Sequence, residues 1–259
     1  MGVVAHSSGH PKLALRDISH VFSSPTGAIP VLDNINLVVE PGSLVSIIGR
    51  SGCGKSTLFN MVAGLLRPDQ GVIELDGDNI SGRIGHVGYM LQKDLLLPWR
   101  TVIDNVILGL EVGKRSKAEC RAIAQPFLDR YGLGGFERRY PNELSGGMRQ
   151  RAALLRTLLC NTDVILLDEP FSALDAQTRA SMQSWLLDIW AEFRKTIVLV
   201  THDVEESVYL SDEVYVLSSR PGSIRDRIEI DLERPRTRGV VTSSRFAELK
   251  AQCLASLEA

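Results

Sequence analysis

Phosphate chemistry is the first capacity that the sequence shows, in a glycine-rich stretch that reads Gly49-Arg50-Ser51-Gly52-Cys53-Gly54-Lys55-Ser56. Its spacing fits G-x-x-x-x-G-K-[ST], the P-loop. The glycines let backbone N–H groups curl around phosphate oxygens, while Lys55 supplies charge to the β- and γ-phosphates and Ser56 offers a hydroxyl to Mg²⁺. We therefore expect ATP and Mg²⁺ to bind here. The expected nucleotide contacts from this loop are Gly49, Ser51, Gly52, Cys53, Gly54, Lys55, Ser56 and Thr57.

Two adjacent carboxylates offer a metal ligand and a base. Asp168 and Glu169 follow the apolar run at residues 164–167. In a P-loop fold a carboxylate at that strand end faces the Mg²⁺ bound by Ser56, so we expect Asp168 to be the metal partner, through water. Glu169 can then reach the water that attacks the γ-phosphate and act as its general base. A solvated pair of acids is the alternative, which the upstream P-loop disfavours.

A parallel sheet is needed to hold these residues, and the apolar pattern predicts one. Short runs typical of buried parallel strands occur at residues 44–48, 164–167 and 197–200. Further strands are expected at 72–75, 87–91, 214–217 and 225–230, an antiparallel pair at 13–22 and 31–39 around a polar loop at 23–30, and helices at 55–66 and 176–193. Residues 95–160 have a helical pattern with Gly and Pro breaks, which predicts an inserted helical subdomain.

Composition sets the class of protein. The chain has 259 residues with 29 basic against 31 acidic side chains and a formal net charge of -2, which argues against bulk affinity for nucleic acid or anionic lipid. No stretch approaches the roughly 18 apolar residues that a spanning helix needs, and residues 1–11 are polar rather than an apolar signal core. The four cysteines fall in no paired or metal-type spacing, so a reduced cytosolic protein is expected. Any membrane role must then come through a partner.

A second glycine-bearing helix start suggests a family. Leu144-Ser145-Gly146-Gly147-Met148-Arg149-Gln150 resembles the LSGGQ signature of ABC ATPases, with Met148 in place of the usual glutamine. Gln92 resembles the Q-loop glutamine, the stretch 172–175 the D-loop, and His202 the switch histidine, all in the family's order. The resemblance covers residues 12–225. It implies an α/β P-loop NTPase (RecA-like) core with an antiparallel β subdomain and an inserted α-helical subdomain, over residues 12–230, with a short charged tail and final helix at 231–259.

The resemblance also implies how the site is built. Two such domains pack head to tail in the family, so that each ATP lies between one P-loop and the other domain's signature. It implies catalytic roles for Glu169, His202, Lys55 and Gln92, and Mg²⁺ contacts from Ser56, Gln92 and Asp168. Nucleotide contacts beyond the P-loop would come from Gln92, Ser145, Gly146, Gly147 and Asp175, and from Phe22, which lies where the family has an adenine-stacking aromatic. A plain core phenylalanine is the alternative for Phe22.

Partners follow from the same resemblance. The second ATPase subunit would be another copy or a related chain, and separate transmembrane permease subunits would carry the solute. Residues 92–102 and 219–224 resemble the subgroup that serves nitrate, aliphatic sulfonate and taurine importers, which implies a solute-binding protein outside the cell and a peripheral position on the cytoplasmic face of the membrane. The apolar residues 95–99 would receive the permease, or simply form the core of the helical insertion. An ABC exporter ATPase or a soluble ABC ATPase remains the alternative function, whereas a small-molecule kinase has no use for the signature.

Overall fold

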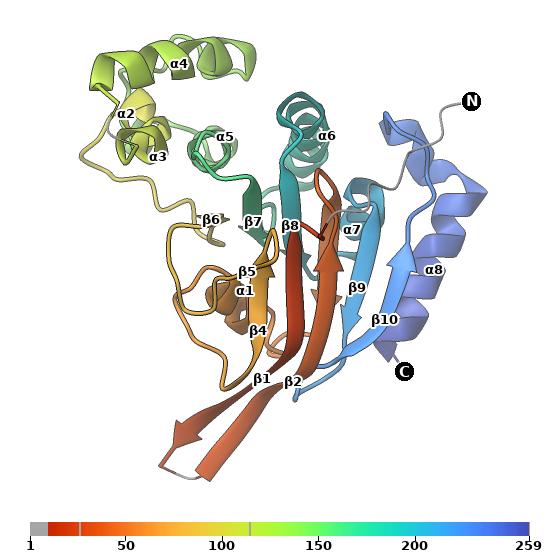
Figure 1. Ribbon diagram of the computed structural model, residues 1–259. Helices are drawn as coiled ribbons and strands as arrows, with labels where there is room; N and C mark the ends of the chain where they lie inside the picture. The colour runs from red at the N-terminus through yellow and green to blue at the C-terminus, as the bar shows by residue number, and fades with distance from the viewer. Residues whose placement is uncertain (1–9, 26, 114, 259) are drawn as a thin grey trace.

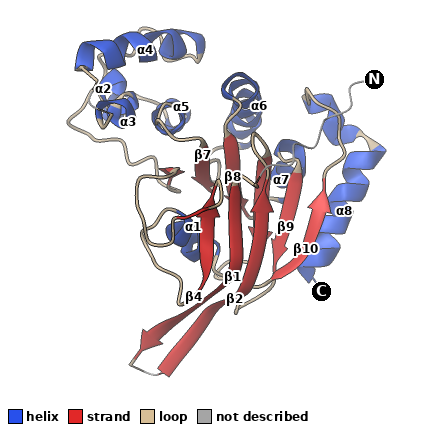
Figure 2. Ribbon diagram, viewed as in Figure 1, coloured by secondary structure: helices blue, strands red, loops and turns tan. Residues whose placement is uncertain are grey.

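The computed structural model describes residues 10–25, 27–113 and 115–258 of the chain. The expected N-terminal segment at residues 1–11 therefore lies almost wholly outside the described residues. The fold is an α/β arrangement of two sheets and surrounding helices (Figures 1 and 2). The strands are β1 Leu13–Ser24, β2 Gly27–Val39, β3 Leu44–Gly49, β4 Gln70–Leu75, β5 Asp78–Asn79, β6 Gly88–Met90, β7 Val164–Asp168, β8 Thr196–Thr201, β9 Glu213–Leu217 and β10 Ile224–Glu229. The helices are α1 Lys55–Val62, α2 Val102–Val106, α3 Leu108–Glu111, α4 Lys117–Arg130, α5 Gly146–Leu158, α6 Ala176–Phe193, α7 Val204–Leu210 and α8 Ser244–Glu258, with 3-10 turns η1 Pro141–Glu143 and η2 Arg238–Thr242.

The larger sheet has the strand order β10-β9-β3-β8-β7-β6. β9, β3, β8, β7 and β6 run parallel, and β10 pairs antiparallel with β9 at the edge. Alternate side chains of these strands enter two separate cores, since successive residues of a strand point to opposite faces. On β7, Ile165 and Leu167 pack with the helices α2–α8, whereas Val164 and Leu166 pack with α1 and the smaller sheet. The predicted parallel-sheet core is confirmed.

The smaller sheet is antiparallel, in the order β2-β1-β4-β5. Its long β1–β2 hairpin projects beyond the larger sheet (Figure 1). The expected polar loop at 23–30 is wrong, because β1 continues to Ser24 and β2 begins at Gly27, with Phe22 paired to Ile29. Pro30 is tolerated because β2 is an edge strand, where the missing N–H leaves no ladder bond unmade.

The helical segment between β6 and β7 lies to one side of the larger sheet (Figure 1). Its first helix, α2, begins only at Val102, so the helical pattern from residue 95 does not form a helix over 95–101. Asn105 explains this, because its Oδ1 accepts from Leu97 N at 2.7 Å and its Nδ2 donates to Leu97 O at 3.1 Å, which holds the segment as a folded loop. Ser116 then starts α4 with a capping box formed with Glu119.

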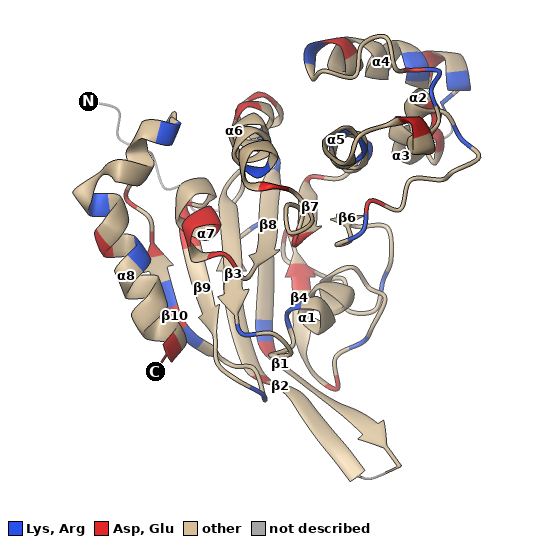
Figure 3. Ribbon diagram, turned by 180° about the vertical axis from the view of Figure 1, so that it is seen from behind, with Lys and Arg blue, Asp and Glu red and all other residues tan. Residues whose placement is uncertain are grey.

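The C-terminal segment packs on the same core. α8 lies beside β9 and β10 (Figure 1), and its Phe246, Leu249 and Cys253 are buried among the residues of the helical side of the sheet. The final helix was expected, but its burial was not. Basic and acidic residues are interspersed over the helices and loops (Figure 3). Within the described residues, no helix is both long enough and apolar enough to span a membrane.

Candidate active site

The P-loop joins β3 to α1 as the motif requires. Gly54, the residue before α1, has φ 106°, and a Cβ there would lie 2.7 Å from Leu32 Cδ2, so the position requires glycine. Lys55 is only 6% exposed, and its ammonium donates to Gly49 O at 2.8 Å and Arg50 O at 3.1 Å. The loop carbonyls therefore hold the charge of Lys55 over the start of the helix, whose dipole adds further positive potential.

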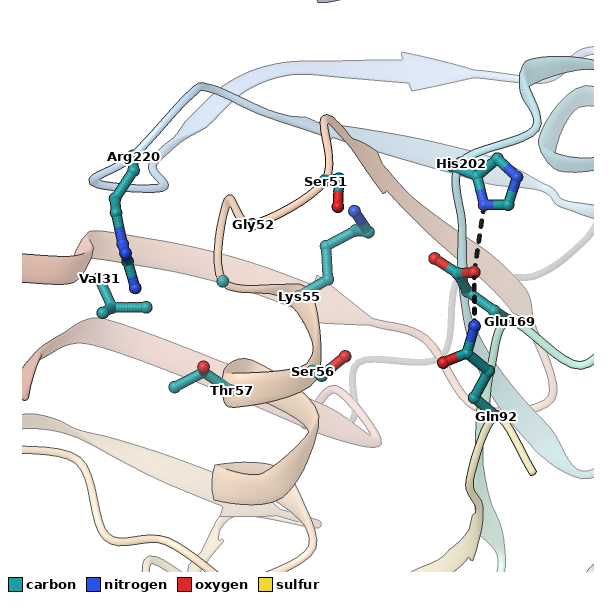
Figure 4. A pocket seen from close by; sticks show the side chains of 11 residues that line it. Val31, Ser51, Gly52, Lys55, Ser56, Thr57, Gln92, Glu169, His202 and Arg220 are labelled. Atoms are coloured by element: carbon teal, nitrogen blue, oxygen red, sulfur yellow. Dashed lines mark hydrogen bonds and ion pairs between the residues drawn. The ribbon is translucent and has the colours of Figure 1, made fainter. Parts of the chain in front are cut away.

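A cavity of about 600 Å³ opens over this loop. The lining residues are Val31, Ser51, Gly52, Gly54, Lys55, Ser56, Thr57, Gln92, Glu169, His202 and Arg220 (Figure 4). The structure thus brings together most of the residues predicted from the P-loop, the Q-loop, the second carboxylate and the switch. Gly49 and Cys53 belong to the same loop, but they are buried and do not line the cavity.

Glu169 stands at the centre of a hydrogen-bonded group. Its Oε2 accepts from Gln92 Nε2 at 3.3 Å and lies 3.2 Å from His202 Nδ1, so one carboxylate oxygen joins the Q-loop to the switch (Figure 4). Its backbone has φ 45°, a conformation that costs a non-glycine residue free energy and often marks functional sites. Glu169 N donates to Val200 O at 2.8 Å, and Ser172 Oγ donates to Glu169 O at 3.0 Å. These bonds fix the backbone and aim the carboxylate into the cavity.

Asp168 lies deeper, at the end of β7. Burial raises the pKa of its carboxyl above the ordinary value, and the hydrogen bond with the Ser56 hydroxyl opposes that rise. Tyr89 Oη lies 3.4 Å from Asp168 Oδ2, and burial together with the charge of Asp168 raises the pKa of the phenol. Among the described residues no cluster of three or more His, Cys, Asp or Glu side chains could hold a metal alone. Ser56 and Asp168 instead form a small oxygen pair, of the kind that holds Mg²⁺ when substrate phosphates complete the shell.

The signature forms a second cavity, of about 390 Å³. Ser145 is the N-cap of α5, and its Oγ accepts from Met148 N at 3.3 Å. The cavity is lined by Ser145, Gly146, Gly147, Met148, Arg151, Ala173, Leu174, Asp175 and Thr178, and so joins the signature to the D-loop. None of these residues lines the P-loop cavity. One copy of the chain therefore carries both halves of the predicted site without bringing them together.

Two arginines connect the signature helix to the segment after Gln92. Arg149 Nε donates to Asp94 Oδ2 at 3.3 Å, and Arg156 donates to Asp94 O at 2.6 Å and to Leu95 O at 2.8 Å. Neither arginine was predicted from the sequence to take part in the site. Their helical spacing of seven residues, which places both on one face of α5, is the signal that could have found them.

Phe22 lies outside the P-loop cavity. It sits on β1 with 41% of its surface exposed, and its ring meets the edge of His20 at a centroid distance of 4.6 Å. The core alternative for Phe22 is therefore wrong, while its role in stacking on adenine stays a prediction. Val31 and Arg220 line the cavity instead, although neither was predicted from the sequence to contact the nucleotide.

The family model described as ABC transporter matches residues 32–172, more than half of the chain. The chain belongs to the ABC transporter family. This ABC ATPase is 44% identical to a nitrate import ATP-binding protein of Synechocystis, over 87% of this chain and 86% of that one. It is 43% identical to a taurine import ATP-binding protein of Escherichia coli, over 93% of each chain, and 41% identical to an aliphatic sulfonates import ATP-binding protein of Bacillus thuringiensis, over 95% and 96%.

A solved structure agrees with this assignment. The ABC ATPase superposes with a TM-score of 0.74 and 29% identity on an ATP-binding cassette solved as a dimer in a post-hydrolysis state bound to ADP and Pi, covering 85% of this chain and all of that one. The predicted P-loop NTPase fold is confirmed. As a member of this family the chain is an ATP-binding protein and an ATP hydrolase.

A buried carboxyl lies behind the switch of this ABC ATPase. Glu206 of α7 is 4% exposed, and its Oε2 accepts from Gln183 Nε2 at 2.9 Å. Gln183 Oε1 in turn accepts from Arg238 Nη2 at 2.6 Å, which ties the C-terminal segment to α6 and α7. Burial, with a smaller contribution from the nearby charge of Asp203, raises the pKa of Glu206 to about 7 from its ordinary 4.5.

This pKa predicts a pH-dependent stability. Between pH 4.5 and about 7 the unfolded carboxyl releases a proton that the folded protein keeps. The contribution of Glu206 to the free energy of unfolding is therefore fully present below pH 4.5 and is lost as the pH rises to about 7. Glu206→Gln stays neutral at every pH. We therefore expect its free energy of unfolding to rise relative to that of the wild type, by up to about 3 kcal/mol between pH 4.5 and about 7. Thermal unfolding from pH 4.5 to 8 measures this gain. Glu205→Gln, at a half-exposed position, is the control, and a difference between Glu206→Gln and wild type that does not change with pH would contradict the assignment.

Proposed function

We propose that this ABC ATPase binds MgATP over its P-loop and hydrolyses it at an interface shared with a second ATPase subunit, either another copy or a related chain. The observation that carries the proposal is the separation of the two cavities, because the P-loop and the signature of one chain do not line a common site. A head-to-tail pair would place each signature over the other chain's P-loop. The structural relative is a dimer bound to ADP and Pi, which supports such a pairing.

Within such a site, each residue has a separate task. Lys55 and the start of α1 hold the β- and γ-phosphates, while Ser145, the N–H groups of Gly146 and Gly147 and the dipole of α5 approach from the second subunit. Ser56, Asp168 and Gln92 would hold Mg²⁺, which neutralises phosphate charge when bound.

Hydrolysis then depends on the group around Glu169. Its carboxylate takes a proton from the attacking water, and its hydrogen-bonded neighbours Gln92 and His202 keep the oxygen oriented. Asp175 caps α6 by accepting from Gln177 N and Thr178 N at 3.1 and 3.0 Å, in the same cavity as the signature. Its place there is the basis for putting it at the subunit seam, linking the two sites.

The transport role comes from the relatives. Their names describe import ATP-binding proteins for nitrate, taurine and aliphatic sulfonates, so we assign this chain to an importer of a small anion of that kind. Its partners would be transmembrane permease subunits and an extracytoplasmic solute-binding protein, with the ATPase peripheral on the cytoplasmic face of the membrane. Nucleic acid is not among the partners we propose.

The permease contact is placed on the segment that follows the Q-loop. Leu95 and Trp99 are 50% and 73% exposed, whereas Leu96 is buried. Trp99 is therefore not part of the core of the helical insertion. An exposed tryptophan seven residues after a Q-loop glutamine that bonds Glu169 is suited to link docking with catalysis.

Trp99→Ala tests this contact. Because Trp99 is on the surface, we expect its removal to change the free energy of unfolding by less than about 0.5 kcal/mol. Hydrolysis by the purified subunit should also be unchanged, while permease-stimulated hydrolysis and solute uptake fall. Trp190→Ala, at a site only 6% exposed, is the matched control and should cost about 3–5 kcal/mol of stability.

Uptake in the native cell decides the direction of transport. Deleting the gene should abolish uptake of nitrate, taurine or an alkanesulfonate, and the Trp99→Ala gene should restore that uptake only in part. Loss of solute efflux in the deletion strain would indicate an exporter instead. Full restoration of uptake by the Trp99→Ala gene would remove the docking role from Trp99.

A further inference from the structure

The turn between β9 and β10 is seated directly on the P-loop. Gly222 N donates to Val31 O and Asp33 N donates to Gly222 O, both at 2.9 Å, so the turn is bonded to β2. A Cβ on Gly222 would lie only 2.2 Å from Cys53 O, inside the P-loop. No side chain fits between the two segments, and the close approach explains the glycine.

Internal hydrogen bonds brace the same turn. Ser218 N donates to Ser223 O at 2.9 Å, Ser223 N donates to Ser218 Oγ at 2.9 Å, and the two hydroxyls lie 3.0 Å apart. Residues 218–223 therefore form a braced turn that is hydrogen-bonded to β2 and packed against the P-loop. The backbone at its tip therefore has a defined place relative to the P-loop.

Arg220 occupies that tip and lines the P-loop cavity. The residue is exposed, and across the described part of the chain its guanidinium makes no hydrogen bond or ion pair. Every other charged side chain that lines this cavity has a partner there: Lys55 bonds to loop carbonyls, and Glu169 pairs with His202. Arg220 is thus a cation held beside the cavity with its hydrogen-bonding and stacking capacity unused.

The orientation of ATP in the cavity follows from the residues at its two ends. Glu169, His202 and Gln92 form one end, while Arg220 and Val31 lie at the opposite end, across the P-loop (Figure 4). A γ-phosphate placed for attack near Glu169 leaves the ribose and base on the side away from it. That side is lined by Arg220 and Val31.

The chemistry of these two residues suits a nucleobase. A guanidinium is planar, weakly hydrated and stacks on aromatic rings, whereas valine offers an apolar contact. Phe22, the aromatic residue expected from the sequence, lies outside the cavity and meets His20. The phosphate end already holds Lys55 and the start of α1, so a further cation at the far end is better placed for the base than for the triphosphate.

We propose that Arg220 binds the adenine base of ATP by stacking its guanidinium plane on the ring, with Val31 contacting the base from β2. The inference rests on the proposed binding of ATP over the P-loop. It makes Arg220, supplied by the β9–β10 turn, a residue that distinguishes a nucleotide from a bare polyphosphate.

The test compares ATP with inorganic tripolyphosphate, which has the phosphates but no base. Calorimetric titration of the full chain with each ligand in Mg²⁺ buffer gives both values of Kd. Arg220→Ala is expected to weaken ATP binding about tenfold, within the range of base stacking on a side chain, and to leave tripolyphosphate within about twofold of wild type. Arg220→Lys keeps the charge but loses the plane, so its Kd for ATP should lie nearer to that of Arg220→Ala than to wild type.

Controls separate this role from others. Arg225→Ala removes an exposed charge five residues further along the chain. Among the described residues that side chain bonds only to Ser256 O, at 3.2 Å, so the substitution should change neither Kd. Equal weakening of both ligands by Arg220→Ala would place the residue on the phosphates and overturn the proposal. No weakening by Arg220→Ala, or a Kd for ATP of Arg220→Lys equal to that of the wild type, would also overturn it. Failure of the wild type itself to bind ATP would instead overturn the proposed function, so the two failures are distinct.

Discussion

Glu169→Gln is expected to bind ATP normally and to hydrolyse it at least about a hundredfold more slowly than the wild type. The amide keeps the size of the side chain and an oxygen that can accept from Gln92, but it cannot take the proton of the attacking water. The unusual backbone of Glu169 is held by Val200 O and Ser172 Oγ, so the substitution should leave the fold intact. Steady-state hydrolysis and ATP titration on the same preparation measure both halves of the expectation.

The same variant should accumulate a dimer that contains ATP, because binding persists while the hydrolysis that weakens the interface does not occur. Light scattering during gel filtration, with and without ATP, detects that dimer. Glu40→Gln, at an exposed position outside the cavity, is the control and should behave as wild type. Hydrolysis near the wild-type rate by Glu169→Gln would remove the residue from its proposed role.

Lys55→Ala and Ser145→Arg should each reduce hydrolysis about a hundredfold or more, for different reasons. Lys55→Ala deletes a charge felt by ATP in both ground and transition states, so binding and turnover should fall together. Ser145→Arg places a long side chain in the signature cavity, which is separate from the P-loop of its own chain. We therefore expect Ser145→Arg to bind ATP almost normally while it loses turnover, and a Kd for ATP that rises as much as for Lys55→Ala would contradict the separation.

Motifs with a fixed local geometry were predictable from the sequence. Residues 49–56 form a P-loop wherever a strand precedes them and a helix follows, and the observed β3 and α1 meet that condition. β7 and α6 were likewise predictable, from residues 164–167 and 176–193. The apolar pattern of a buried strand or of a long helix is sufficient to identify it without knowledge of its neighbours.

Features that depend on distant contacts were not predictable in this way. Pro30 looks like a loop residue until β2 is known to be an edge strand. The burial of Phe246 in α8 depends on where that helix meets β9 and β10, and no local pattern encodes it. Arg220 reaches the cavity only because Gly222 seats its turn against Cys53, far away in the sequence. Burial beneath α6 and α7 raises the pKa of Glu206 to about 7, which its place in the sequence does not indicate.

Mixing the two inactive variants tests the shared site most directly. In a head-to-tail pair of one Lys55→Ala and one Ser145→Arg subunit, the intact P-loop of the second faces the intact signature of the first, so one complete site forms. Purified Lys55→Ala and Ser145→Arg are therefore expected to regain ATP hydrolysis when mixed, well above the sum of the two measured alone. A mixture no more active than that sum, or single variants each as active as the wild type, would contradict a site built from two subunits.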